Sequence, residues 1–260
     1  MLSPIFIDHA PDLRVYRVPA YKDNYLWIVH HPDACLLVDP GEEAPMLKAL
    51  ETLSLKPDAI LVTHKHWDHV SGVDPLAQRF NARVYAPHGI SGCQAQQLVE
   101  DGRVLTFGEL CVRVIALPGH TLEHVGYAIE RADPPLVFVG DTLFGAGCGR
   151  MFEGEPAQMW QSIKHLLALP ENTLVYCAHE YTRANLRFAL EIEPDNLALV
   201  ARARKVDLSA KATIPTSLAL EMATNPFCRV RELAQGEKWQ GMDEAALFGT
   251  LRRMKDNFQG

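Results

Sequence analysis

The residues best suited to chemistry form one short cluster, Thr63-His64-Lys65-His66-Trp67-Asp68-His69. Neutral imidazole and carboxylate are ligands that zinc, iron and manganese accept. Side chains two positions apart share a face of an extended strand, so we expect His64 and His66 to project together. Asp68 and His69 should lie beyond a bend. Because four donors exceed what one tetrahedral ion takes easily from a short segment, the cluster predicts a site for two metal ions.

Three further candidate ligands stand at or just past the C-terminal end of an apolar run. They are His120 after Val112–Leu117, Asp141 after Leu136–Gly140 and His179 after Leu174–Ala178. In layered α/β folds, binding sites are assembled at strand ends. We therefore expect these side chains to join the first cluster as seven ligands for two ions. Each alone could be a capping aspartate or a hydrogen-bonded buried histidine, but the combination favours a metal site.

The strands and helices that carry these residues can be predicted from the apolar pattern. Short runs rich in Val, Ile and Leu predict strands at 25–29, 35–38, 59–62, 112–117, 136–139 and 174–177, several of them buried on both faces. Helical spacing between them, at 44–53 and 156–169, indicates α/β layering. After His179 the strand signal stops, and prolines separate expected helices at 183–192, 197–206, 218–223 and 245–258. This pattern predicts a small helical C-terminal domain.

The composition excludes several classes of protein. The 260 residues carry a net charge of −7, which disfavours binding to nucleic acid or to an anionic membrane. Six scattered cysteines without a C-x-x-C pair predict reduced thiols rather than disulfides or a zinc knuckle. The segment Met1–Val18 has neither a basic start nor a continuous apolar core, so we expect no export signal and a cytoplasmic location. We also expect a monomer. The absence of a G-x-S-x-G motif disfavours covalent catalysis.

Four motifs together resemble the metallo-β-lactamase superfamily. They are Thr63-His64-x-His66-x-Asp68-His69, Pro118-Gly119-His120-Thr121, Gly140-Asp141-Thr142-Leu143-Phe144 and Cys177-Ala178-His179-Glu180-Tyr181-Thr182. Within that superfamily the chain is similar to the glyoxalase II (hydroxyacylglutathione hydrolase) family over nearly its whole length. The similarity rests on Lys22-Asp23-Asn24-Tyr25, Gly147-Cys148-Gly149-Arg150, Ala223-Thr224-Asn225-Pro226-Phe227 and Leu251-Arg252-Arg253-Met254-Lys255-Asp256.

The resemblance implies an αββα sandwich over residues 1–178 and a helical domain for a glutathione thioester over 179–260. It implies two divalent ions, zinc in the first place, with iron or manganese as alternatives. One ion would be held by His64, His66 and His120, the other by Asp68, His69 and His179, with Asp141 bridging both. The catalytic carboxylates would be Asp68 and Asp141, and the residues that bind the glutathione moiety would be Arg150, Tyr181, Arg252 and Lys255.

Three residues outside these sets need comment. Lys65 stands where many relatives carry histidine, but it should point away from its neighbours' face and leave the site unaffected. Phe152 stands where some relatives carry tyrosine, and it lacks a hydroxyl for substrate contacts. We expect His124 in the core or on the surface rather than among the ligands.

The implied activity is hydrolysis of S-D-lactoylglutathione and related S-2-hydroxyacylglutathiones to glutathione and D-lactate, the second step of methylglyoxal detoxification. A metal-bridging hydroxide would attack the thioester carbonyl, because coordination lowers the pKa of water from about 15.7 towards about 7. The thiolate would then leave with little help, since a free thiol has a pKa of about 8.5.

Four alternatives stay open. A persulfide dioxygenase of the same superfamily would use a single iron on the side of His64 and His66 and would consume oxygen. A β-lactamase would be exported, and a nuclease would suit a less acidic chain. A metal-free scaffold or binding module would keep the fold without the chemistry. Metal content separates this last alternative from an enzyme.

Overall fold

The computed structural model describes residues 5–9, 12–209 and 211–259. The chain forms two compact units, the first of residues 1–116 and 123–140 and the second of residues 117–122 and 141–260. The boundary expected between residues 178 and 179 stays a prediction. Part of the N-terminal segment considered for an export signal, residues 1–4, 10 and 11, lies outside the described residues. No described helix has the length and apolar character needed to cross a bilayer.

The first unit is built on a sheet whose strands follow one another in chain order. They are β1 (Ile5–His9), β2 (Leu13–Ala20), β3 (Asn24–His31), β4 (Ala34–Val38), β5 (Ala59–Leu61), β6 (Arg83–Pro87) and β7 (Gln97–Val99). Strands β1 to β4 pair antiparallel, and β4 to β7 pair parallel. Parallel neighbours need a crossover connection, which helices supply between β4 and β5 and between β5 and β6. These are α1 (Glu43–Leu53), the short α2 (Trp67–Val70) and α3 (Val73–Phe80).

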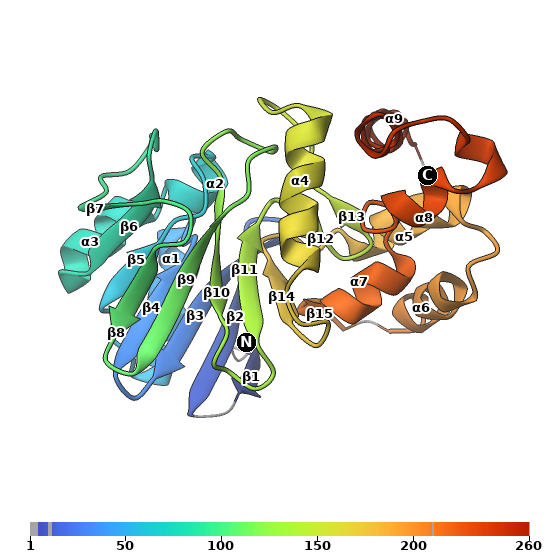
Figure 1. Cartoon of the computed structure of the whole chain (residues 1–260). Coiled ribbons are helices and arrows are strands. Elements are labelled where there is room, and N and C mark those ends of the chain that lie inside the picture. The colour runs from blue at the N-terminus through green and yellow to red at the C-terminus, as the bar shows by residue number, and fades with distance from the viewer. Residues whose placement is uncertain (1–4, 10–11, 210, 260) are drawn as a thin grey trace. The chain divides into compact units, whose positions relative to one another are not determined.

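A second layer of strands in this unit lies against the first sheet (Figure 1). It contains β8 (Val104–Phe107), β9 (Leu110–Ala116), β10 (Val125–Ile129) and β11 (Leu136–Gly140), all antiparallel. The ring of Trp27 lies 6.3 Å from that of Phe138 between the layers, and the buried Tyr127 hydroxyl donates to the Val62 carbonyl. On the opposite face of the first sheet, Met46 of α1 and Leu76 of α3 are fully buried. The unit therefore has the helix–sheet–sheet order of a sandwich.

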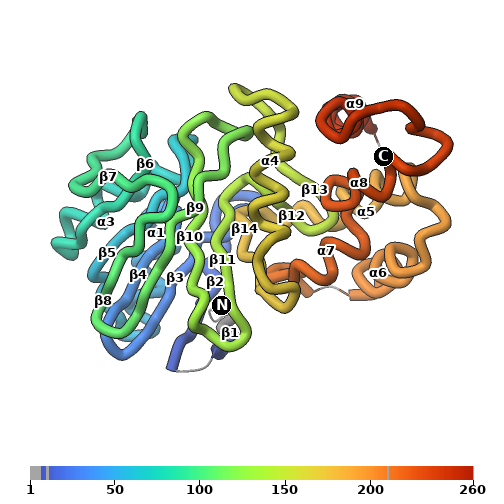
Figure 2. Tube along the Cα trace, in the orientation of Figure 1, coloured from blue at the N-terminus to red at the C-terminus, as the bar shows by residue number. Residues whose placement is uncertain are grey.

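The second unit is mainly helical, as the orange and red part of the trace in Figure 2 shows. Its helices are α4 (Pro156–Leu167), α5 (Thr182–Ile192), α6 (Leu197–Asp207), α7 (Leu218–Thr224), α8 (Val230–Ala234), the 3-10 turn η1 (Glu237–Trp239) and α9 (Glu244–Asp256). Its strands are β12 (Leu143–Phe144) paired with β13 (Gly147–Cys148), and β14 (Leu174–Cys177) paired with β15 (Thr216–Ser217). Pro156 begins α4 at the first helical position, as expected, behind a capping box of Glu155 and Gln158.

A buried polar network holds the helices of the second unit to the β12–β13 hairpin. Glu221 is fully buried and accepts hydrogen bonds from Arg202 (2.6 Å), from the Ala146 backbone (2.8 Å) and from Asn225 (2.9 Å). Asn225 in turn donates to the Gly147 carbonyl at 3.0 Å. Because a buried charge is tolerated only when it is paired and hydrogen-bonded, this network specifies where the hairpin lies on α7.

All six strands and all six helices predicted from the sequence are present, with ends shifted by a few residues. One expectation was wrong: a strand, β15, does occur after His179. It has two residues and no apolar run, so its pairing with β14 alone defines it. The six cysteines are free, as predicted, and four of them are buried. The architecture is the αββα type of mixed α/β fold followed by a helical C-terminal region.

Candidate active site

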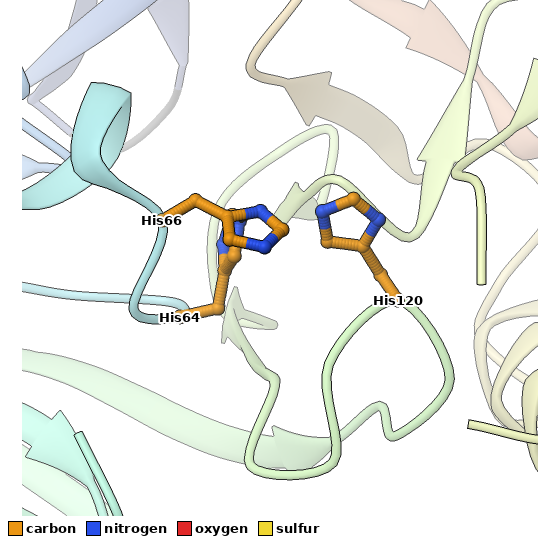
Figure 3. Close-up of side chains that lie close together, drawn as sticks. All are labelled: His64, His66 and His120. Carbon is orange, nitrogen blue, oxygen red and sulfur yellow. Dashed lines mark hydrogen bonds between the residues drawn. The ribbon is translucent and has the colours of Figure 1, made fainter. Parts of the chain in front are cut away.

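The first group of candidate ligands lies directly after β5. His66 keeps an extended backbone (ψ 144°) and α2 begins at Trp67, so the predicted bend falls between His66 and Asp68. The rings of His64 and His66 do share a side: the Nε2 atom of His64 lies 3.1 Å from Nδ1 of His66 (Figure 3). Lys65 points elsewhere and forms an ion pair with Glu123 at 3.3 Å.

Asp39, at the C-terminal end of β4, organises this group. Its carboxylate accepts the Thr63 backbone N–H at 2.7 Å and the Thr63 hydroxyl at 2.6 Å. It also accepts the Nδ1–H of His69 at 3.0 Å. Since the Thr63 hydroxyl already donates to Asp39, its oxygen accepts from Nδ1 of His64, 3.0 Å away. In both histidines the Nε2 atom is thereby the unprotonated nitrogen, which is the form that binds a metal.

Asp68 lies beside His69 on the first turn of α2. Its Oδ2 atom is 3.7 Å from Nε2 of His69 and accepts a hydrogen bond from the buried Asn24 side chain at 2.9 Å. Asn24 belongs to the Lys22-Asp23-Asn24-Tyr25 motif, for which the sequence alone suggested no role. Its amide restricts the rotation of the Asp68 carboxylate and keeps it on the side of His69.

The second group of candidate ligands belongs to the second unit and centres on Asp141. Its Oδ2 atom lies 3.4 Å from Nε2 of His120, and its Oδ1 atom lies 3.4 Å from Nε2 of His179. The Nδ1–H of His120 donates to the Arg150 carbonyl at 2.7 Å, so Nε2 is the nitrogen turned towards Asp141. One carboxylate thus faces two imidazoles, with one oxygen for each.

The loop that carries His120, also drawn in Figure 3, is held from both sides. Ser162 of α4 donates its hydroxyl to the Pro118 carbonyl at 2.7 Å, and the Phe152 backbone donates to the His120 carbonyl at 3.2 Å. The exposed Phe152 ring also lies edge-on to the His120 ring, with 5.3 Å between centroids. Phe152 therefore restricts the position of His120.

The four residues expected to contact glutathione all lie in the second unit. Tyr181 precedes α5, is partly exposed and stacks on His179, with ring centroids 4.7 Å apart and planes 5° from parallel. Lys255 is partly buried beside Phe188 and Phe258, and its Nζ donates to the Ala184 carbonyl at 3.1 Å. Burial lowers the pKa of Lys255 to about 8, and the nearby Arg252 and Arg187 add to this effect.

The two arginines of this set differ in exposure. The Arg150 side chain is 56% exposed, whereas that of Arg252 is 7% exposed. Arg252 donates to the Cys148 carbonyl at 2.8 Å and covers the ring of Phe227. Arg253, the next residue of α9, is exposed. Arg252 is therefore engaged inside the protein, whereas Arg150 and Arg253 are exposed.

The donor set fits divalent metal ions. The candidates are imidazoles and carboxylates that are buried or partly buried. In the first unit, His64 and His69 lie with the carboxylate of Asp39 in one group whose nitrogen and oxygen atoms are within 4.8 Å of one another. Three of the histidines have Nδ1 engaged by Asp39, Thr63 or a backbone carbonyl, the arrangement typical of histidine ligands. These groups are suited to hold a cation that activates water, and they provide no serine or cysteine nucleophile.

Sequence reasoning missed one residue of this site and placed another only coarsely. Asp39 follows the apolar run 35–38 just as Asp141 follows 136–139, so the same signal could have identified it. His124 was expected merely in the core or on the surface. It is buried in the core, which is one of the two expected locations. Its ring also stacks on that of the candidate ligand His64, with 4.7 Å between centroids.

Comparison with known proteins agrees with this geometry. A family model described as the metallo-beta-lactamase superfamily matches residues 22–92 and 95–179, so fold and site define a protein of that class. A second model, the hydroxyacylglutathione hydrolase C-terminus, matches residues 180–258. The chain belongs to the hydroxyacylglutathione hydrolase family. Similar proteins of that name include one from Photobacterium profundum (46% identity) and one from Cupriavidus metallidurans (44%), each aligned over 95% of this chain and 100% of its own length.

Solved structures show the same fold. The B3 metallo-beta-lactamase BLEG-1 superposes with a TM-score of 0.64 and 23% identity, over 82% of this chain and 99% of its own. TTHA1623, solved in a di-iron-bound form, superposes with a TM-score of 0.56 and 26% identity, over 87% of this chain and 100% of its own.

Proposed function

We propose that this protein hydrolyses S-2-hydroxyacylglutathione thioesters, with S-D-lactoylglutathione as substrate and glutathione and D-lactate as products. This reaction is the second step of methylglyoxal detoxification. The names of the full-length relatives support the substrate class. The observation that carries the proposal is the Asp141 carboxylate, which faces His120 with one oxygen and His179 with the other. A carboxylate in that position suits a bridge between two metal ions.

The proposed metal site joins the two groups of ligands described above. We assign one ion to His64, His66 and His120, the other to Asp68, His69 and His179, and the bridge to Asp141. The di-iron form of TTHA1623 supports a binuclear site in this fold. Zinc is the first choice of metal, and iron and manganese suit the same nitrogen and oxygen donors.

When bound, the two ions supply an activated water and polarise the thioester carbonyl. The residues of this chain bind and orient. Asp39 holds His69 directly and His64 through Thr63. The Nε2 atoms of both histidines therefore stay unprotonated. The cationic groups of Lys255 and Arg150 bind the carboxylates of the glutathione moiety. No side chain has to protonate the leaving group, because a thiolate whose thiol has a pKa of about 8.5 leaves readily without a proton.

The activity can be tested by following the loss of thioester absorbance of S-D-lactoylglutathione alongside the metal content of the protein. We expect about two metal ions per chain and a fall of at least about 100-fold in kcat/KM for Asp141→Asn, since even residues that only support a ligand contribute 10- to 100-fold. Asp195→Asn, at an exposed position of the same unit, is the matched control.

Two results would contradict the proposal. Unimpaired turnover in Asp141→Asn would remove the bridging carboxylate. Oxygen consumption by a protein with one iron per chain would instead indicate the persulfide dioxygenase alternative. The cytoplasmic location and the monomeric state stay predictions.

A further inference from the structure

Asp256, the last residue of α9, joins two of the arginines described above. Its Oδ1 atom accepts hydrogen bonds from Nε and Nη2 of Arg252 at 3.2 and 3.0 Å. The same oxygen accepts from Nε of Arg150 at 3.2 Å, across 106 positions of sequence. One carboxylate oxygen therefore ties the C-terminal end of α9 to the segment that follows β13.

Arg252 strengthens the same connection. Its Nη1 atom donates to the carbonyl of Cys148, two residues before Arg150. All three kinds of donor nitrogen in its guanidinium are thus engaged within the protein, and the side chain is 7% exposed. The described structure leaves Arg252 little capacity for a ligand, although its residue type suggests direct contact.

Arg150 is in the opposite situation. Only its Nε forms a hydrogen bond within the described residues, and its side chain is 56% exposed. The two Nη groups, which form the fork that recognises carboxylates in a bidentate manner, therefore face solvent. Holding an arginine by Nε fixes the plane of the guanidinium while keeping that fork available.

Neither helix stability nor surface charge explains an aspartate at this position. The C-terminus of a helix carries a partial negative charge, so an acidic residue there is unfavourable. An arginine four residues before an acid is also the weaker order for a helical ion pair. A partly exposed ion pair, with Arg150 56% and Asp256 31% exposed, contributes little to stability. A role in placing the arginines is the remaining explanation.

We propose that Asp256 is a positioning residue that holds Arg150 so that its two Nη groups bind a carboxylate of the glutathione thioester, with Arg252 as the internal support. This inference rests on the proposed function. The direction of the change in binding distinguishes it from a simple effect of charge. Removing a negative charge near an anionic ligand should strengthen binding by simple Coulomb attraction. If Asp256 positions Arg150, the same change weakens binding.

The test compares Asp256→Asn with wild type in two measurements: KM and kcat for S-D-lactoylglutathione, and the Kd of glutathione by titration calorimetry. We expect KM and Kd to rise about tenfold, the contribution of one charged hydrogen-bonded contact, with kcat changed less than about twofold. The control is Asp243→Asn, which removes one negative charge from the other end of α9. Asparagine replaces the aspartate cap on the Ala246 N–H there.

A second variant keeps the proposal testable if Asp256→Asn fails to fold. Arg150→Lys changes an exposed residue and keeps its charge, but one ammonium group cannot bind Asp256 and also form a fork. We expect the same rise in KM and Kd. Unchanged or tighter binding in either variant, or a loss confined to kcat, would overturn the proposal. A wild type that does not hydrolyse the thioester would refute the proposed function, while the glutathione Kd values would still decide the role of Asp256.

Discussion

The Nδ1–H of His69 donates to the carboxylate of Asp39, 3.0 Å away, and both side chains are almost fully buried. The same carboxylate accepts two hydrogen bonds from Thr63, whose oxygen faces His64. Asp39 therefore determines the protonated nitrogen of two candidate metal ligands without being assigned as a ligand itself. Metal binding by His64 and His69 should therefore depend on the negative charge of Asp39.

Asp39→Asn tests this dependence. An amide of the same shape places an N–H group where the carboxylate accepted hydrogen bonds. The substitution should therefore disturb the orientation of His64 and His69. We expect metal affinity and kcat/KM each to fall by about 10- to 100-fold, so that the variant loses metal on dialysis. Glu51→Gln, at an exposed position of α1, should leave both unchanged. Full metal retention by Asp39→Asn would show that the carboxylate does not orient these ligands.

Gly140 should be sensitive to a single methyl group. It has a left-handed backbone (φ +47°), and a Cβ there would come within 2.5 Å of the Thr63 hydroxyl and 2.7 Å of His124 Nε2. For Gly140→Ala we expect a loss of about 2 to 5 kcal/mol in the free energy of unfolding, combining backbone strain and overpacking. Gly102→Ala shares the left-handed backbone (φ +75°) but meets no atom within 4 Å, so only strain of about 1 to 2 kcal/mol remains. Equal losses in the two variants would contradict the packing argument.

The buried ion pair of the second unit should be essential for its stability. Glu221→Ala leaves Arg202 buried without its partner, which costs about 3 to 5 kcal/mol in chemical denaturation. Glu130→Ala breaks an exposed pair with Arg113 and should cost less than about 1 kcal/mol. If both variants unfold at the same denaturant concentration, the network around Glu221 does not stabilise the hairpin.

Substrate binding should weaken above about pH 8 because of Lys255. Its pKa is lowered to about 8, chiefly by burial, so the ammonium is charged below that pH and becomes neutral as the pH rises. Since the neutral form no longer attracts a carboxylate, we expect KM to rise between pH 7 and pH 9 while kcat changes less. The same shift makes folding less favourable below about pH 8, where the native state must keep a desolvated charge, and this cost disappears as the pH rises towards 10.5.

Lys255→Arg is the matched variant for the pH profile, because a guanidinium stays charged throughout this range. We expect a flatter dependence of KM on pH. If KM depends on pH in the same way in both proteins, the rise in KM is caused by titration of the substrate or of another group and not of Lys255.

The types of candidate ligand and most of the helices and strands could be predicted from the sequence. The donors at 64, 66, 68 and 69, and those at 120, 141 and 179, are metal-ligand types in a pattern that local reasoning can detect. Buried strands and amphipathic helices were equally visible, because apolar periodicity is a local property. Elements that are defined mainly by their pairing partners, such as the two-residue β15, could not be detected in this way.

The residues that support the candidate ligands, and the nitrogen that each histidine leaves unprotonated, became visible only in the folded chain. That Asp39 orients His69, that Asn24 holds Asp68 and that Asp256 joins Arg150 to Arg252 are contacts between residues 30, 44 and 106 positions apart. The difference between the buried Arg252 and the exposed Arg150 has the same origin. Burial and hydrogen-bond partners arise when distant segments pack, so no property of the local sequence encodes them.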